Sequence, residues 1–204
     1  MAPLEPPDPP FATGAPYWYW LGGRPALDFV NTRRERWRRN VDCLVDARDV
    51  VEWLMRAELL AAPAPAAPPP RLLAQARELR EAIDDGVRAA VNTHARDPRA
   101  LAVIDEWLAF AGGRPALHQG PDGQPLLGER APADSPRRAL GMVALDAARM
   151  LGLAAERERV RICASHTCSA RFYDRSPAGR RRWCSMALCG NVEKARRHRA
   201  KGRA

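Results

Sequence analysis

The sequence lacks the features that mark membrane and secreted proteins. Its apolar runs all stay well short of the ~18 residues that a membrane-spanning helix requires. The opening segment, MAPLEPPDPPFATG, has no basic stretch followed by an apolar one and so does not resemble a secretion signal. We therefore expect a protein of the reducing cytoplasm with no membrane partner, in which residues 1–16 form a disordered leader.

Motifs for catalysis are also missing. Residues 17–152 contain no phosphate-binding loop, no cluster of carboxylates and no nucleophile placed beside a base, so we expect that the protein is not an enzyme. Asp28 and Asn31 are polar beside apolar neighbours, a pattern that favours capping of local backbone over contact with a small ligand. Four tryptophans are more typical of a core than of a ligand pocket: Trp18, Trp20, Trp53 and Trp107. The sequence leaves open whether residues 17–152 bind a small molecule.

Lysine is nearly absent, since only Lys194 and Lys201 accompany the arginines among the 33 basic residues. A GC-rich genome produces this bias without selection, so the distribution of charge is more informative than arginine identity. Residues 157–204 contain 14 basic and 3 acidic residues, a net charge of +11. The other 156 residues contain 19 basic and 21 acidic ones, a net charge of −2. This asymmetry is typical of a module that faces a polyanion.

Helical spacing of apolar residues dominates residues 17–152. Asp46 is a candidate N-cap for a helix over about 47–60, and the apolar residues of 72–91 keep one helical face for about six turns. The proline- and alanine-rich segment 61–70 cannot be helical and is expected to link these two helices.

Two further helices are expected to begin at Asp97-Pro98 and Ser135-Pro136, where a capping residue precedes a proline in the first helical position. Asp122-Gly123 predicts a hairpin within 115–129, whereas GGRPALDFVNT at 22–32 fits a strand or a helix. The resulting fold class is mainly α with minor β (α+β). We expect a helical domain over 17–152 that ends near Gly152.

Four of the five cysteines lie within 27 residues, as Cys163-x4-Cys168 and Cys184-x4-Cys189 separated by fifteen residues. Two cysteine pairs at the ends of a short loop are what tetrahedral Zn²⁺ requires, so we expect one structural zinc bound by all four. Arg171–Asp174 and Arg181–Trp183 are expected to pair as strands and bring the two ligand pairs together. The order of knuckle, hairpin and second ligand pair leading into a helix is treble-clef-like.

Other chemistry for these cysteines fits the sequence less well. Two disulfides suit a secreted protein, a redox switch typically has a two-residue spacing, and a catalytic zinc keeps a position for water. His166 could replace one cysteine as a ligand, although an exposed loop histidine is the simpler interpretation, and Cys43 is expected to be a small buried residue. Because little else forms a core here, folding of this segment should depend on zinc.

The tracts Arg182-Trp183-Cys184-Ser185-Met186 and Cys189-Gly190-Asn191 resemble the CGNR zinc finger. In that family the finger follows an ABATE domain, whose opening the segment GGRPALDFVNT resembles. The resemblance implies an ABATE-like domain at 17–152, a CGNR-type finger at 157–204 and a role as a stress-responsive transcription regulator. Val192 departs from the family pattern, which has arginine there, and this puts a phosphate contact at that position in doubt.

Basic residues flank the second cysteine pair and predict contact with nucleic acid. Asn191 either reads a base edge or caps the following helix. The full predicted set is Arg180, Arg181, Arg182, Asn191, Lys194, Arg196, Arg197 and Arg199. DNA is favoured over RNA as partner, and the protein is expected in the cytoplasm on the nucleoid, with a helical domain that senses a signal or forms a homodimer. The alternatives are an RNA-binding or ribosome-associated protein and a protein-interaction adaptor.

Overall fold

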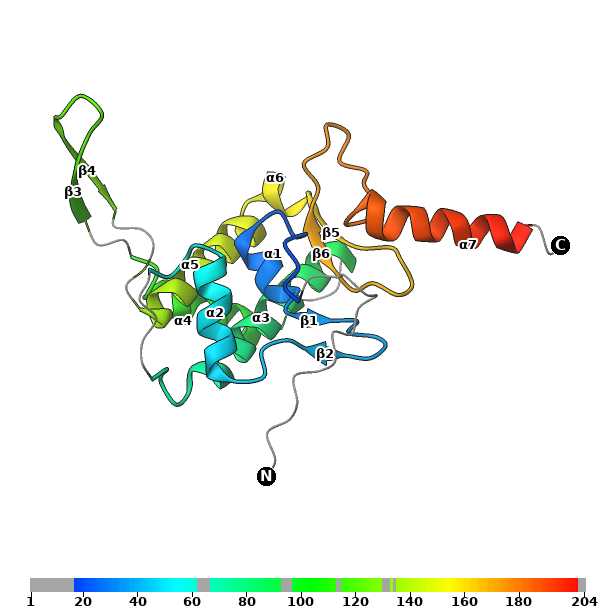
Figure 1. The fold of residues 1–204 in the computed structure, drawn as a ribbon, viewed down its shortest axis with the longest axis horizontal. Helices are drawn as coiled ribbons and strands as arrows, with labels where there is room; N and C mark the ends of the chain where they lie inside the picture. Colours follow the sequence, from blue (N-terminus) through cyan, green and yellow to red (C-terminus); the bar gives the residue numbers. More distant parts are fainter. Residues whose placement is uncertain are drawn as a thin grey trace.

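The computed structural model describes residues 17–61, 67–92, 97–112, 115–129, 133 and 135–201. The leader expected at 1–16 and residues 62–66 of the expected linker lie outside the described residues. The described chain has a mostly helical N-terminal region and a small C-terminal part with a two-stranded hairpin and a four-cysteine cluster, which confirms the expected fold class. A hairpin and the last helix project from opposite ends of the helical body (Figure 1).

Six α-helices form the N-terminal region and the connection to the C-terminal part within the described residues. They are α1 (Pro25–Val30), α2 (Ala47–Arg56), α3 (Leu72–Asn92), α4 (Pro98–Leu108), α5 (Pro136–Gly152) and α6 (Ala154–Arg157). Pro25 in the first helical position resolves the ambiguous segment 22–32 as a helix. None of the helices in the described segments has the length and apolar character that crossing a bilayer demands.

Local capping explains where α2, α4 and α5 begin. The side chain of Asp46 accepts hydrogen bonds from the backbone of Arg48 and Asp49, and Asp49 completes a capping box. Asp97 and Ser135 cap α4 and α5 in the same way, as their sequence context predicts. The helix expected over 47–60 ends earlier, at Arg56, because Glu58 adopts a left-handed backbone with φ of 58°.

The core lies between α1, α2, α3, α4 and α5. Cys43 is fully buried in this core, as expected, and so are the inward-facing residues of α5. Trp18, Trp53 and Trp107 are also core residues. Trp20 is not, since 45% of it is exposed while its ring stacks on that of Trp53. The expectation of four core tryptophans is therefore wrong for one of them.

The described strands form three two-stranded antiparallel sheets. They pair β1 (Arg33–Arg34) with β2 (Val41–Asp42), β3 (Pro115–Gln119) with β4 (Pro125–Glu129), and β5 (Val160–Ile162) with β6 (Arg171–Tyr173). The β3–β4 hairpin confirms the turn predicted from Asp122-Gly123, where Gly123 has a φ of 79°.

The expected pairing of Arg171–Asp174 with Arg181–Trp183 is wrong. Residues 171–173 pair with 160–162 instead. The Asp174 carboxylate accepts the backbone N–H of Arg181 at 2.7 Å, and the Arg182 carbonyl accepts the N–H of Ala164 at 2.8 Å. These two bonds use backbone groups that a strand at 181–183 would need for pairing with β6.

Asp28 is a buried acid on α1. Its Oδ1 accepts the backbone N–H of Gly22 at 2.7 Å, which confirms the capping interpretation of this residue. Burial raises the pKa of Asp28 to about 7, against the opposing effect of this hydrogen bond. The carboxyl group is therefore poised between its neutral and charged forms near neutral pH.

We expect Asp28→Asn to flatten the pH dependence of stability. Because the folded-state pKa is raised, the carboxyl contributes stability below pH 4 that is lost as the pH rises through about 7. At ~1.4 kcal/mol per pKa unit, the loss amounts to a few kcal/mol. Thermal melts of both proteins at pH 5 and pH 8 measure it. The melting temperature of the variant relative to that of the parent should be higher at pH 8 than at pH 5. The same difference in melting temperature at both pH values would contradict the assignment.

Candidate metal centre

The Sγ atoms of Cys163, Cys168, Cys184 and Cys189 all lie within 4.8 Å of one another. Two of the separations are 3.9 Å, from Cys168 to Cys184, and 3.7 Å, from Cys184 to Cys189. Tetrahedral coordination at ~2.3 Å places thiolate sulfurs about 3.8 Å apart, whereas a disulfide requires about 2.05 Å. The four thiols are free, and the cluster is consistent with one metal site of a zinc finger.

The sulfurs are too close to ionise independently. The hydrogen bond with Cys168 contributes most to lowering the pKa of the Cys163 thiol, and that with Cys163 contributes most to raising the pKa of Cys184. Three of the four residues are buried, so repulsion between thiolates would be weakly screened by water. A cation at the centre of the cluster is what would permit all four to be deprotonated together.

The first ligand pair forms a knuckle between β5 and β6. The backbone N–H of Cys163 donates to the Ala170 carbonyl at 2.9 Å, and that of Cys168 donates to the Ser165 carbonyl at 3.1 Å. The N–H of Ala170 also donates to the Cys168 Sγ at 3.4 Å. These bonds point both sulfurs of the pair toward the same centre.

The second pair spans the start of the last helical segment, a π-helical turn η1 (Met186–Gly190) followed by α7 (Asn191–Lys201). The Ser185 side chain caps the turn by accepting the N–H of Leu188 at 3.3 Å. A Cβ at Gly190 would lie 2.7 Å from the Met186 sulfur, so a larger residue there would displace this exposed and flexible side chain.

Glu193 joins α7 to the knuckle and was not predicted from the sequence. Its carboxylate accepts the Ser165 hydroxyl at 2.9 Å and lies 2.7 Å from the His166 Nδ1. The hydrogen bond with His166 contributes most to lowering the pKa of Glu193 to about 2. His166 is exposed, as expected, and it lies outside the four-sulfur cluster.

The strands of the finger are attached to the helical region through Arg171. Its guanidinium is 2% exposed and donates to both carboxylate oxygens of Asp84 on α3, at 2.6 and 3.1 Å. The Asn31 side chain pairs with the backbone of Arg171. Its amide donates to the Arg171 carbonyl at 2.9 Å, and its oxygen accepts the Arg171 N–H at 2.8 Å. Asn31 therefore caps backbone, but on a strand 140 positions away rather than locally.

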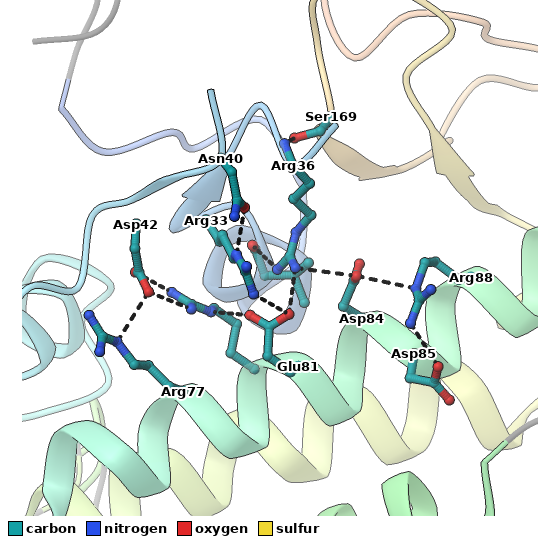
Figure 2. A network of polar contacts seen from close by, with 12 residues as sticks. Arg33, Arg36, Asn40, Asp42, Arg77, Glu81, Asp84, Asp85, Arg88 and Ser169 are labelled. Carbon is teal, nitrogen blue, oxygen red and sulfur yellow. Dashed lines mark hydrogen bonds and ion pairs between the residues drawn. The ribbon is translucent and has the colours of Figure 1, made fainter. Parts of the chain in front are cut away.

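The acidic face of α3 also holds the β1–β2 hairpin (Figure 2). The Arg36 guanidinium lies 2.6 Å from Glu81 and 3.4 Å from Asp84, and its backbone N–H donates to the Ser169 hydroxyl at 3.1 Å. Burial would raise the pKa of Glu81, but the hydrogen bond from Arg36 and nearby arginine charges lower it to about 2. One helix thus binds a finger strand and a loop of the N-terminal region.

The structure places the predicted nucleic-acid contacts on an exposed loop and on α7, which extends away from the body (Figure 1). The side chain of Arg197 lies outside what the structure describes. The exposed members are Arg180, Arg181, Arg182, Asn191, Lys194, Arg196 and Arg199. Two of them also have local roles, since Arg181 donates to the Cys184 carbonyl at 2.7 Å and Arg196 to Glu193 at 3.1 Å.

The capping alternative for Asn191 is wrong. Its backbone is helical, with φ of −68° and ψ of −40°, whereas a capping residue has a non-helical conformation. Ser185, six positions earlier, fills the capping position because η1 extends the helical segment toward the N-terminus.

Replacement of Asp84 by alanine should destabilise the protein by about 3 to 5 kcal/mol, because it leaves the buried Arg171 charge uncompensated. Urea unfolding at pH 7 measures the loss. Glu52→Ala is the matched control, since it removes an exposed ion pair with Arg56 and should cost less than ~1 kcal/mol. Equal losses of unfolding free energy in the two variants would show that the Arg171–Asp84 pair stabilises the protein no more than an exposed ion pair does.

Comparison with known families agrees with this architecture. A family model named ABATE, described as "Putative stress-induced transcription regulator", matches residues 23–153, and a model of the CGNR zinc finger matches residues 159–202. The first description names a transcription regulator and not an enzyme. A search of curated proteins found no match to the chain. Because the first model alone covers more than half of the sequence, the chain belongs to the ABATE family and ends in a CGNR zinc finger.

Proposed function

We propose that this protein is a zinc-dependent, DNA-binding transcription regulator of stress responses. In this proposal residues 157–204 bind DNA on the nucleoid, and residues 17–152 sense a signal or form a homodimer. The observation that carries the proposal is the position of α7. This cationic helix projects from the body and is anchored at its base by the four-sulfur cluster (Figure 1).

The proposed metal is one structural Zn²⁺ bound by Cys163, Cys168, Cys184 and Cys189. Four soft thiolates at tetrahedral spacing suit this ion, and four protein ligands leave no open position for catalysis. The ion would supply the positive charge that permits four neighbouring thiolates. The chain itself orients the base of α7 through the Glu193 contacts with Ser165 and His166.

The charge of the finger supports a polyanionic partner. Residues 157–204 carry a net charge of +11, and a zinc ion with four thiolates subtracts about 2, which leaves roughly +9. If about five phosphates are contacted, affinity for duplex DNA should fall with salt along a log–log slope of roughly −4 to −5.

Duplex DNA is favoured because α7 has 11 residues and is exposed on most sides, dimensions that suit a helix lying in or across the major groove. The regulator description of the matching family supports the same choice. Duplex RNA offers phosphates of similar charge, and binding to it is the principal competing outcome of the experiment below.

The zinc assignment predicts one zinc ion per purified chain and a finger that loosens when the metal is removed. Cys184→Ser should lose the metal and the hydrogen-exchange protection of α7, while α3 stays protected by the helical core. Cys43→Ala is the matched thiol control and should keep its zinc, because Cys43 lies in the main core. Absence of stoichiometric zinc, or unchanged protection of α7 after chelation, would overturn the assignment.

The DNA assignment predicts that Arg180→Ala, Lys194→Ala and Arg199→Ala together weaken binding and make the salt slope shallower by about 3. These exposed residues are chosen because Arg181 and Arg196 have local structural bonds. Fluorescence anisotropy with labelled duplex DNA and duplex RNA at several salt concentrations is the measurement.

The matched control for this triple variant removes three exposed arginines on α2 and α4, which lie away from α7 in Figure 1. It replaces Arg48, Arg56 and Arg99 with alanine and should keep the parental slope. An equal effect in the control would mean that only total charge matters. Tighter binding to RNA would favour the RNA alternative, and binding to neither would favour a protein-interaction adaptor.

A further inference from the structure

A second cationic element lies beside the finger, on the loop from Glu35 to Asn40 between β1 and β2. Its outermost residues are Trp37, which is 49% exposed, and Arg38 and Arg39, whose side chains are each 48% exposed. Trp20 is exposed to a similar extent, and what distinguishes Trp37 is that two exposed arginines follow it directly in the same loop. Trp37 is not part of the two buried apolar clusters of the described chain, and its ring lies 5.7 Å from the Arg171 guanidinium.

The loop contacts the zinc knuckle directly. The Trp37 indole N–H lies 3.4 Å from the His166 carbonyl, and the backbone of Arg36 donates to the Ser169 hydroxyl at 3.1 Å. His166 in turn contacts Glu193 at the base of α7, 2.7 Å away. His166 therefore contacts both the loop and the helix proposed to bind DNA.

The loop is held in a defined conformation. Glu35 and Asn40 both have left-handed backbones, with φ of 48° and 53°, which side-chain-bearing residues rarely adopt. The Glu35 carbonyl accepts the N–H groups of Arg38 and Asn40 at 2.8 and 2.9 Å, and its carboxylate pairs with Arg39. Inside the loop, Arg36 is fixed to α3 (Figure 2).

We propose that Trp37, Arg38 and Arg39 form a second contact with duplex DNA, alongside the zinc finger. The two guanidinium groups would bind phosphates, and the Trp37 ring would pack against the sugar-phosphate edge. Glu35 orients both arginines and offsets one of their charges, so the outer face keeps a net positive charge. This inference rests on the proposed function, and it extends the DNA-binding surface from the finger onto the ABATE region.

The test compares zinc-loaded, full-length proteins for binding to the same labelled DNA duplex. Arg38→Ala with Arg39→Ala should weaken binding about tenfold at 0.1 M salt and make the log–log salt slope shallower by about 2. Arg38→Lys with Arg39→Lys should retain the slope, which shows that charge and not folding is measured. Trp37→Ala should weaken binding without changing the slope.

The matched control is Arg48→Ala with Arg56→Ala, which removes the same charge from α2. Zinc content and melting temperature establish that each variant is folded. Hydroxyl-radical footprinting should show protection lost on one flank of the parental footprint in the Arg38 and Arg39 alanine variant.

The outcomes separate the two proposals. If the parental protein does not bind duplex DNA, the proposed function itself fails. If the parent binds DNA, and the finger variant is weakened, while the Arg38 and Arg39 variant matches its control, the loop contact is wrong and the proposed function stands. A loss that affects duplex RNA or a protein partner but not DNA also overturns the loop contact.

Discussion

The buried guanidinium of Arg171 connects the two parts of the molecule. It lies on a finger strand, and its charge is balanced by Asp84, which belongs to the central helix of the N-terminal region. If either group lost its partner while it stayed buried, the remaining charge would carry a large desolvation cost, so the pair keeps β6 against α3. Asn31 adds two backbone hydrogen bonds to the same strand. The first half of the finger is therefore built into the ABATE core.

The remaining half of the finger depends on different interactions. Beyond β6, the chain returns through an exposed loop to the second cysteine pair and α7. The buried apolar cluster around the four sulfurs is small, and consists of Cys163, Ala170, Phe172, Cys184 and Cys189. Because so little apolar area is available, the sulfur cluster and the Glu193 hydrogen bonds are the main constraints on the direction of α7. The anchored strands and the helical segment that begins at the second cysteine pair thus meet at the knuckle.

Features set by neighbouring residues were predictable from the sequence, whereas those set by distant partners were not. Asp46, Asp97 and Ser135 cap helices through bonds within three positions, and the cysteine spacing indicated their convergence. The partner of β6 was predicted wrongly. A turn does form at 176–179, between the two segments expected to pair, where the Gly179 N–H donates to the Ser176 carbonyl at 3.1 Å. The backbone groups of Arg181 and Arg182 nevertheless bond to Asp174 and Ala164, and β6 pairs with β5. Glu193 and the Arg171–Asp84 pair carry no sequence signal, because charged residues in such a chain are usually solvated.

Net charge alone overstates the surface available to DNA, because many arginines have structural roles. Arg80 and Arg171 are almost fully buried on Asp42 and Asp84, and Arg36 is bound by Glu81. Glu81 and Asp84 on α3 bind Arg36 of the β1–β2 loop (Figure 2). Asp84 also binds Arg171 of the finger strand, so the same helix holds the loop and the strand. A shift of α3 would therefore act on the β1–β2 loop and on β6, whereas the direction of α7 is set mainly by the sulfur cluster and by the Glu193 hydrogen bonds.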